Sequence, residues 1–219
     1  HRNTYNYVVL LRIHFLKKAV KDLSEIHYFR GIFNGIFMRL TFFFLLVLFS
    51  SSFAQNSSHD YVYQLPFESG KTVLIMQGYN GKYSHKNKFA LDFRLKKGKF
   101  ICAARGGKVV KMVEHNNEGG GNIKFINKAN YIVIAHDDAT YGGYWHLEQN
   151  GALVEVGDSV NVGDIIGRSG STGFSSMAHL HFMVYSYDKK GKQYTTPTFF
   201  NTKNKGIRHL KSYSWVKRN

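Results

Sequence analysis

The chain contains little cysteine, proline or acidic residue. Its 219 residues include one Cys, two Pro and 14 Asp or Glu, against 30 Lys or Arg. A single cysteine excludes an internal disulfide and a cluster of thiolate metal ligands. We expect Cys102, within the apolar run Phe100–Ala104, to be a small buried side chain. The shortage of carboxylates leaves a formal net charge of +16, which favours an anionic partner.

The chain also lacks an obvious membrane span. The apolar run Leu40–Phe49 is shorter than the ~20 residues that cross a bilayer as a helix. It follows the short basic start Met38-Arg39 and precedes Ser52-Phe53-Ala54, a plausible cleavage site. This pattern predicts a secretory signal peptide over residues 38–54, with a membrane anchor as the alternative.

Residues 1–37 precede the first methionine. We interpret them as translated upstream sequence, with a poorly ordered cytoplasmic extension as the alternative. Removal of residues 1–54 takes away seven Lys or Arg and two Asp or Glu, which leaves 23 against 12 and a net charge near +11. The remainder is long enough for one domain, which we divide into an N-terminal segment, 55–70, and a main domain, 71–219.

A basic exported protein suits an anionic cell envelope. We therefore expect a secreted or periplasmic location. Nucleic acid is the competing partner, but the sequence has no helix with basic spacing and no aromatic RNA-binding pattern to support it.

No segment shows a sustained helical period, and most of the 21 glycines punctuate short runs of β-branched and aromatic residues. The expected strands are Thr72–Met76, Phe89–Phe93, Lys108–Val113, Tyr131–Ala135, Gly143–Leu147 and Leu180–Tyr185. We therefore predict an all-β, antiparallel fold. The glycine-rich segment Asn116–Asn122 is either a solvated hairpin tip, which we favour, or a wall of a binding groove.

Between Val154 and Gly173, closely spaced valines and isoleucines are closed twice by Gly-Asp. This pattern indicates small hairpins around a flattened barrel. Biotinyl and lipoyl carrier domains show a similar pattern, but they need a lysine at the exposed hairpin tip. Asn161 stands there instead, which argues against a carrier.

The segment Ser169–Met183 carries the most informative residues. A glycine-rich turn leads into a strand-like run with His179 and His181. Side chains alternate along a strand, so both imidazoles project to the same side. They can share a metal, or one can bind it while the other moves protons. Two polar residues on a solvated face are the alternative.

A second pair of ligand-type residues is His85 and Asp92. Asp92 stands between Leu91 and Phe93, where a buried carboxylate is costly unless it is paired or bound to metal. An exposed edge strand would also accommodate it. The odd separation of the pair means that a turn through Lys86–Lys88 must bring His85 back for shared ligation.

His146 lies in Gly143–Leu147. Period two would place it beside Tyr144, with Trp145 facing the core. Such a histidine can be structural or catalytic. We reject His136 as a ligand because it opens an Asp-rich turn, where a hydrogen-bonded histidine is the better interpretation.

One His, one Asp and another His make the three-ligand set of a catalytic zinc site, with a fourth position open. Nitrogen and oxygen donors without thiolate favour zinc, although spacing leaves manganese and cobalt open. The helical His-Glu-x-x-His motif is absent, so a histidine must be the general base.

The motifs occur in the order His85…Asp92, Tyr144-x-His146-Leu147, Gly167-x-Ser-Gly-x-Thr-Gly173 and His179-Leu-His181-Phe182. In this order the chain resembles the lysostaphin-type zinc metallopeptidases, which cut peptidoglycan cross-bridges, over residues 70 to 187. The resemblance implies a flattened antiparallel sheet with a loop-walled groove. It implies zinc ligation by His85, Asp92 and His181, and catalysis by His146, His179 and Tyr79. Six residues separate His85 from Asp92, where many members have three.

We therefore expect a zinc endopeptidase that acts, as a monomer, on peptidoglycan peptides. We expect neither nucleic-acid binding nor stable membrane insertion after signal cleavage. A degenerate member that binds wall peptides or activates another hydrolase is one alternative, and a protease of secreted proteins is the other.

Overall fold

The computed structural model describes Lys17 and residues 61–219. The predicted signal peptide, 38–54, and the upstream segment 1–37 apart from Lys17 lie outside the described residues. Among the helices that are described, none has the length and apolar character needed to cross a membrane.

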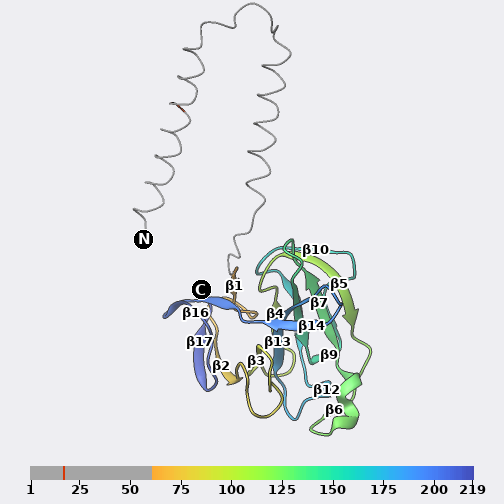
Figure 1. Cartoon of the computed structure of the whole chain (residues 1–219). Helices are drawn as coiled ribbons and strands as arrows, with labels where there is room; N and C mark the ends of the chain where they lie inside the picture. Colours follow the sequence, from red (N-terminus) through yellow and green to blue (C-terminus); the bar gives the residue numbers. More distant parts are fainter. Residues whose placement is uncertain (1–16, 18–60) are drawn as a thin grey trace, which may run out of the picture. The chain divides into compact units, whose positions relative to one another are not determined.

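Short strands account for nearly all regular structure between residues 61 and 219 (Figure 1). The strands are β1 (Val62–Gln64), β2 (Thr72–Gln77), β3 (Ala90–Phe93), β4 (Phe100–Cys102), β5 (Gly107–Val113), β6 (Gly119–Gly120), β7 (Tyr131–Ala135), β8 (Tyr141–Trp145), β9 (Leu147–Ala152), β10 (Ser159–Val160), β11 (Ile165–Ser169), β12 (Gly173–Phe174), β13 (Leu180–Tyr187), β14 (Gln193–Thr196), β15 (Phe199–Thr202), β16 (Gly206–Arg208) and β17 (Ser214–Lys217). One 3-10 helix, η2 (Ile123–Lys128), is the only helix in this part of the chain. The predicted all-β fold is confirmed.

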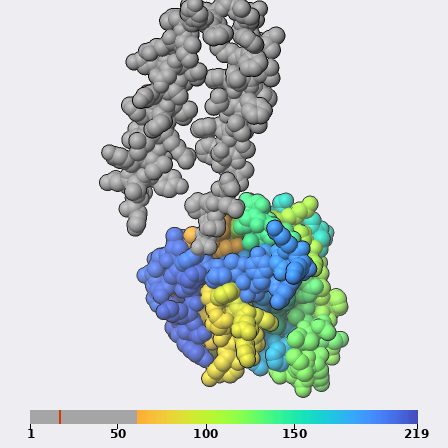
Figure 2. All heavy atoms as spheres, viewed as in Figure 1, coloured from red at the N-terminus to blue at the C-terminus, as the bar shows by residue number. Residues whose placement is uncertain are grey.

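The largest sheet has nine strands in the order β10-β5-β7-β8-β13-β3-β2-β17, with β14 paired to β13. All of its pairings are antiparallel. In the space-filling view, the yellow residues around β2 and β3 lie between two blue regions of the C-terminal part, as this order requires (Figure 2). Strands far apart in sequence therefore become neighbours at β13 and β3.

The core lies between this sheet and a second one of order β4-β11-β9. Phe93, Tyr144 and Phe182 come from the large sheet, and Ile101 and Ile166 come from the small one; all five are fully buried. Burial of such an apolar side chain stabilises a fold by about 1.5–3 kcal/mol. This packing holds β3, β8 and β13 rigidly side by side.

The folded unit includes residues before position 71. β1 pairs in parallel with β15, and Tyr63, Leu65 and Phe67 are buried in the core. At least this part of the N-terminal segment is therefore structural. Cys102 is also buried, as the sequence predicts.

The predicted strand Gly143–Leu147 is wrong in its second half. β8 ends at Trp145, His146 has a φ of 70°, and β9 begins at Leu147 in the other sheet. The left-handed backbone at His146 breaks the alternation of side chains. Tyr144 consequently faces the core, whereas Trp145 lies on the opposite face, the reverse of the prediction.

The segment Asn116–Asn122 is not a free hairpin tip, contrary to the favoured interpretation. Within it, β6 pairs in parallel with β12, which belongs to the glycine-rich turn before His179. The backbones approach so closely that a Cβ at Gly119 would lie 1.9 Å from the Ser171 carbonyl oxygen. The segment supports that turn, and the alternative that it forms a wall of a binding groove stays a prediction.

Candidate metal centre

One carboxylate oxygen is the meeting point of the predicted ligands. Asp92 and His181 are opposite each other in the register of β3 and β13. The distance from Asp92 Oδ1 is 2.9 Å to His181 Nδ1 and 3.2 Å to His85 Nε2. His85 Nε2 and His181 Nδ1 are 3.2 Å apart. Three donors thus form a small triangle.

The size of this triangle fits a tetrahedral zinc ion. Zinc bonds of 2.0–2.2 Å place neighbouring ligand atoms about 3.4 Å apart. The three edges between Asp92, His85 and His181 are within about half an ångström of that value. In the part of the chain that the structure describes, this is the only group of three or more His, Cys, Asp or Glu close enough to hold a metal.

A tight turn brings His85 to the triangle, as the odd separation requires. The His85 amide donates to the Gly81 carbonyl, and the Lys88 amide donates to the His85 carbonyl at 2.9 Å. Asn87 closes the turn with a φ of 57°, a conformation that Asn tolerates. The buried His85 ring donates from Nδ1 to the Gly78 carbonyl at 3.0 Å. Its Nε2 therefore carries the free lone pair that a metal needs.

Gln77 orients the carboxylate from the other side. Its amide nitrogen donates to Asp92 Oδ2 at 3.1 Å, so Oδ1 is the oxygen that faces the histidines. The Gln77 amide oxygen accepts from the amides of Tyr83 and Ser84, which lie in the loop before His85. The sequence analysis missed this residue. The sequence feature that could have indicated this role is a polar side chain at the end of a strand, directly before the loop that carries His85.

The protonation states also suit a metal. Burial alone raises the pKa of Asp92, but the hydrogen bond from His181 and the surrounding imidazoles outweigh it and hold that pKa well below its usual range. Burial lowers the pKa of His181. The site therefore presents a charged carboxylate and a neutral imidazole near neutral pH, as metal binding requires.

Two further imidazoles adjoin the triangle. His146 Nδ1 donates to the Thr172 carbonyl at 2.7 Å, and His179 Nδ1 donates to the Met177 carbonyl at 2.8 Å. Because a carbonyl only accepts, the neutral form of each ring carries its lone pair at Nε2. The two ring centroids are 4.6 Å apart. Burial, together with the neighbouring His179 and His181, lowers the pKa of His146 to about 3.

Both rings lie close to the candidate metal position. His179 Nε2 is 3.7 Å from Asp92 Oδ1, and the centroid of His146 is 5.9 Å from that of His181. The structure therefore brings together all five histidine and aspartate residues of the predicted site. These are His85, Asp92, His146, His179 and His181.

The contacts of Tyr79 are with Thr198, Phe89 and His209, not with the metal triangle. Its hydroxyl bonds to the Thr198 carbonyl at 3.0 Å and to the Thr198 hydroxyl at 2.7 Å, and it accepts from the Thr198 amide. Its ring packs against Phe89 and His209. No described hydrogen bond joins Tyr79 to the metal triangle. Its catalytic role stays a prediction, and its contacts give it a structural one.

His136 is a hydrogen-bonded turn residue, as predicted. Its Nδ1 donates to the Gly106 carbonyl at 2.8 Å. Its ring contacts Tyr63 edge to face.

Comparison with known proteins gives a family. Residues 86–195 match peptidase family M23. The chain is 34% identical over 113 residues to the glycyl-glycine endopeptidase ALE-1 of Staphylococcus capitis, covering 51% of this chain and 28% of that protein. It is 37% identical over 111 residues to lysostaphin of Staphylococcus staphylolyticus, covering 50% and 21%. The chain thus spans less than a third of the length of these relatives.

Among solved structures, the catalytic domain of lysostaphin from Staphylococcus simulans is 29% identical and gives a TM-score of 0.41. The alignment covers 57% of this chain and 86% of that domain. Zinc is the cofactor of the matched family, and the donors of the His85–Asp92–His181 triangle fit it. The match over half of the chain shows that this protein belongs to peptidase family M23, as a metallopeptidase of the lysostaphin type.

Proposed function

We propose that the chain is a zinc endopeptidase that hydrolyses peptide stems or cross-bridges of bacterial peptidoglycan. The observation that carries the proposal is the geometry around Asp92 Oδ1. Three donors suit one metal ion, and two more imidazoles stand beside them, each held through Nδ1 by a backbone carbonyl. A structural zinc site is closed by four protein ligands, whereas an open three-ligand site is typical of catalysis.

His85, Asp92 and His181 hold the metal in this proposal. Zinc, when bound, supplies Lewis-acid chemistry at the scissile carbonyl and at water. One of His146 and His179 would accept the proton of the attacking water at Nε2, and the other would stabilise the oxyanion in the form that carries a proton at Nε2. The carbonyls of Thr172 and Met177 fix both rings before the substrate arrives.

Similarity to named relatives supports the substrate class. ALE-1 is named a glycyl-glycine endopeptidase, which favours glycine-containing cross-bridges as one class to test. The predicted signal peptide supports a secreted or periplasmic location. The excess of Lys and Arg over Asp and Glu supports retention on an anionic envelope.

The described surface gathers part of this positive charge in one hollow. It is lined by Lys71, Arg94, Lys96 and Lys99, with Glu68 as its single acidic residue. None of these side chains takes part in an ion pair with another described residue. The hollow is separate from the metal triangle and supports envelope binding, not catalysis.

The test is digestion of purified peptidoglycan by the full chain. We expect new free amines and no new sugar reducing ends, loss of activity in EDTA, and recovery on addition of zinc. Mass analysis of the released muropeptides then identifies the bond. His181→Ala should abolish cleavage, and His115→Ala, which removes an exposed histidine, is the matched control.

Three outcomes would overturn the proposal. Release of reducing ends would mean that a glycosidic bond is cut. Full cellular function of the His181→Ala protein would favour the alternative of a degenerate wall-binding or activating module. Cleavage of glycine-rich proteins in preference to intact wall would point to the other alternative, a protease of secreted proteins.

A further inference from the structure

A row of aromatic side chains starts at the metal triangle. In the register of β7, β8 and β13, Tyr131, Trp145 and His181 lie opposite one another on the same face of the sheet. The Trp145 ring is 5.6 Å from the His181 ring and 6.2 Å from the Tyr131 ring, measured between centroids. The opposite face of these strands belongs to the core.

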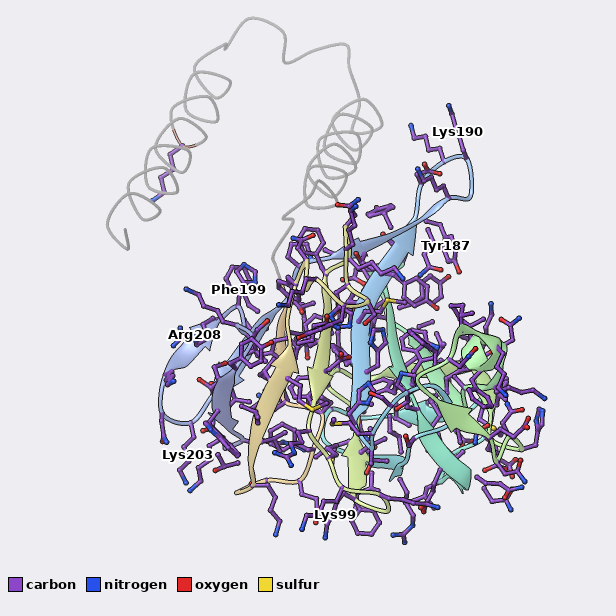
Figure 3. The ribbon with its side chains drawn as sticks, turned by 90° about the horizontal axis from the view of Figure 1, so that it is seen from below. Lys99, Tyr187, Lys190, Phe199, Lys203 and Arg208 are labelled. Carbon is purple, nitrogen blue, oxygen red and sulfur yellow. The ribbon has the colours of Figure 1, made fainter. Side chains whose placement is uncertain are left out.

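The row continues along β13, away from the metal. The Trp145 ring is 6.4 Å from Tyr185, Tyr185 stacks on Tyr141 at 5.4 Å, and Tyr187 is 5.8 Å from Tyr185. We call Trp145, Tyr141, Tyr185 and Tyr187 the aromatic strip. Figure 3 shows Tyr187 on the hairpin that extends to Lys190 at its tip.

Gly143 makes room for the strip. It lies between Tyr141 and Trp145 on β8, and a Cβ there would come within 2.0 Å of the Trp145 ring. The indole therefore occupies the space that a side chain at this position would take. In Tyr141-Gly-Gly-Tyr-Trp145, alternation places Tyr141 and Trp145 on one face of β8, with Gly143 between them. The row of rings therefore runs from the metal triangle to the outer tyrosines.

The chemistry of the strip is amphipathic. Every ring in it carries an O–H or N–H group, and none is phenylalanine. Tyr187 is 44% exposed, and Trp145 and Tyr141 are half-buried. Tyr185 is 4% exposed, so it packs behind the other rings and presents little surface of its own. Burial raises its pKa, so its hydroxyl stays protonated. A neutral surface of apolar ring faces with hydroxyl groups at their edges matches a pyranose sugar, which has apolar C–H faces and a hydroxyl rim.

We propose that the aromatic strip is a saccharide subsite that holds the glycan strand of peptidoglycan while the attached peptide reaches the metal triangle. This inference rests on the proposed function for its substrate. Tyr187 lies six positions after His181 along β13, which is about 20 Å at 3.3 Å per residue. An extended peptide of about six residues spans the same distance. The peptide then lies beside Trp145 and the sugar at the outer tyrosines.

A binding experiment tests the subsite without catalysis. The chain has two tryptophans, and Trp215, in β17, is 59% exposed. In the Trp215→Phe protein, Trp145 is the sole reporter of intrinsic tryptophan fluorescence. Peptide-free glycan strands, prepared by removing all stem peptides, should change this fluorescence in a saturable way. Tyr187→Ala and Tyr141→Ala should weaken the apparent affinity by about tenfold each.

A kinetic experiment separates sugar binding from peptide binding. The kcat/KM of the same variants should fall about tenfold more on intact wall than on a sugar-free peptide. Tyr187→Phe, which keeps the ring, should recover most of the loss. Tyr194→Ala is the control: Tyr194 is 51% exposed but pairs with Ser186, whose side chain alternates to the other face.

The outcomes are distinguishable. Equal losses on wall and peptide, or no response of Trp145 to peptide-free glycan, would overturn the saccharide subsite. If the wild-type chain cleaves neither substrate, the proposed function fails, and glycan binding alone then decides whether the strip is a saccharide site.

Discussion

The amide nitrogen of Gln77 is 3.1 Å from Oδ2 of Asp92, on the neighbouring strand. This bond leaves Oδ1 as the oxygen that faces His85 and His181. The same glutamine accepts hydrogen bonds from the loop before His85. Gln77 therefore positions two of the three candidate metal ligands without touching the metal itself.

Replacing Gln77 should weaken zinc binding. In Gln77→Met, the side chain keeps its approximate volume but loses both the donor to Asp92 and the acceptor for the loop amides. Loss of a group that orients a metal ligand costs about 10- to 100-fold in metal affinity. Competition with a fluorescent zinc chelator measures the affinity. Gln149→Met, at an exposed position, is the control and should bind zinc like the wild type; equal affinity of both variants would show that Gln77 is dispensable.

Zinc should stabilise the folded chain. A ligand at 100 times its Kd that binds only the native state adds about 2.7 kcal/mol to the free energy of unfolding. For a chain of this size, each kcal/mol corresponds to roughly 2–4 °C in Tm. Thermal unfolding followed by circular dichroism should show this rise with zinc and its reversal by EDTA. The His181→Ala protein should show no rise, and a rise of the same size would place the metal elsewhere.

His146 should be required for activity but not for stability. Its φ of 70° is tolerated by Asn, so His146→Asn keeps the backbone conformation while removing the imidazole. Loss of a general base or an oxyanion donor lowers kcat by about 10²–10⁴-fold. Steady-state cleavage and urea unfolding of the same preparation measure the two effects. An active His146→Asn enzyme would remove His146 from the proposed proton transfer.

His136 should make the chain less stable at acidic pH. Burial lowers its pKa below that of an unfolded histidine, and its Nε2 is buried without a hydrogen-bond partner. Between these two pKa values the unfolded chain binds more protons, so the free energy of unfolding falls as the pH drops below about 6.5. His136→Asn keeps an N–H donor for the Gly106 carbonyl and does not titrate there.

Urea unfolding of EDTA-treated protein at pH 7 and pH 5 measures this effect. The wild type should lose more stability between the two values than His136→Asn does. The metal triangle is unaltered in both proteins, so its own titration cancels in the comparison. Identical losses would mean that His136 titrates in the folded state as it does in the unfolded chain.

The sequence predicted the strands well where alternation is undisturbed. β2, β3, β5, β7 and β13 fall within two residues of their predicted bounds because β-branched and aromatic residues recur there between turn residues. The meeting of His85 with Asp92 and His181 was implied by the family resemblance, and strand geometry added only that a turn must bring His85 back toward Asp92. These are local rules that a single sequence can display.

Other features depend on tertiary contacts. Nothing in the local sequence shows that His146 adopts a left-handed conformation, since this arises where the chain passes from one sheet to the other. The sides of Tyr144 and Trp145 were therefore inverted. The role of Gln77 was missed because its partners, Asp92 and the loop amides, are 6 to 15 residues away. The parallel pairing of β6 with β12 joins glycines more than 50 positions apart, which composition cannot reveal.

That pairing has a consequence for control of the enzyme. Gly173 and Ser175 donate their amides to the carbonyls of Glu118 and Gly120, and the turn they belong to supplies the acceptors for both His146 and His179. One surface loop thus sets the tautomers of both imidazoles together. A molecule that separated β6 from β12 would disturb the carbonyl contacts of His146 and His179 together. The three candidate metal ligands would keep their positions.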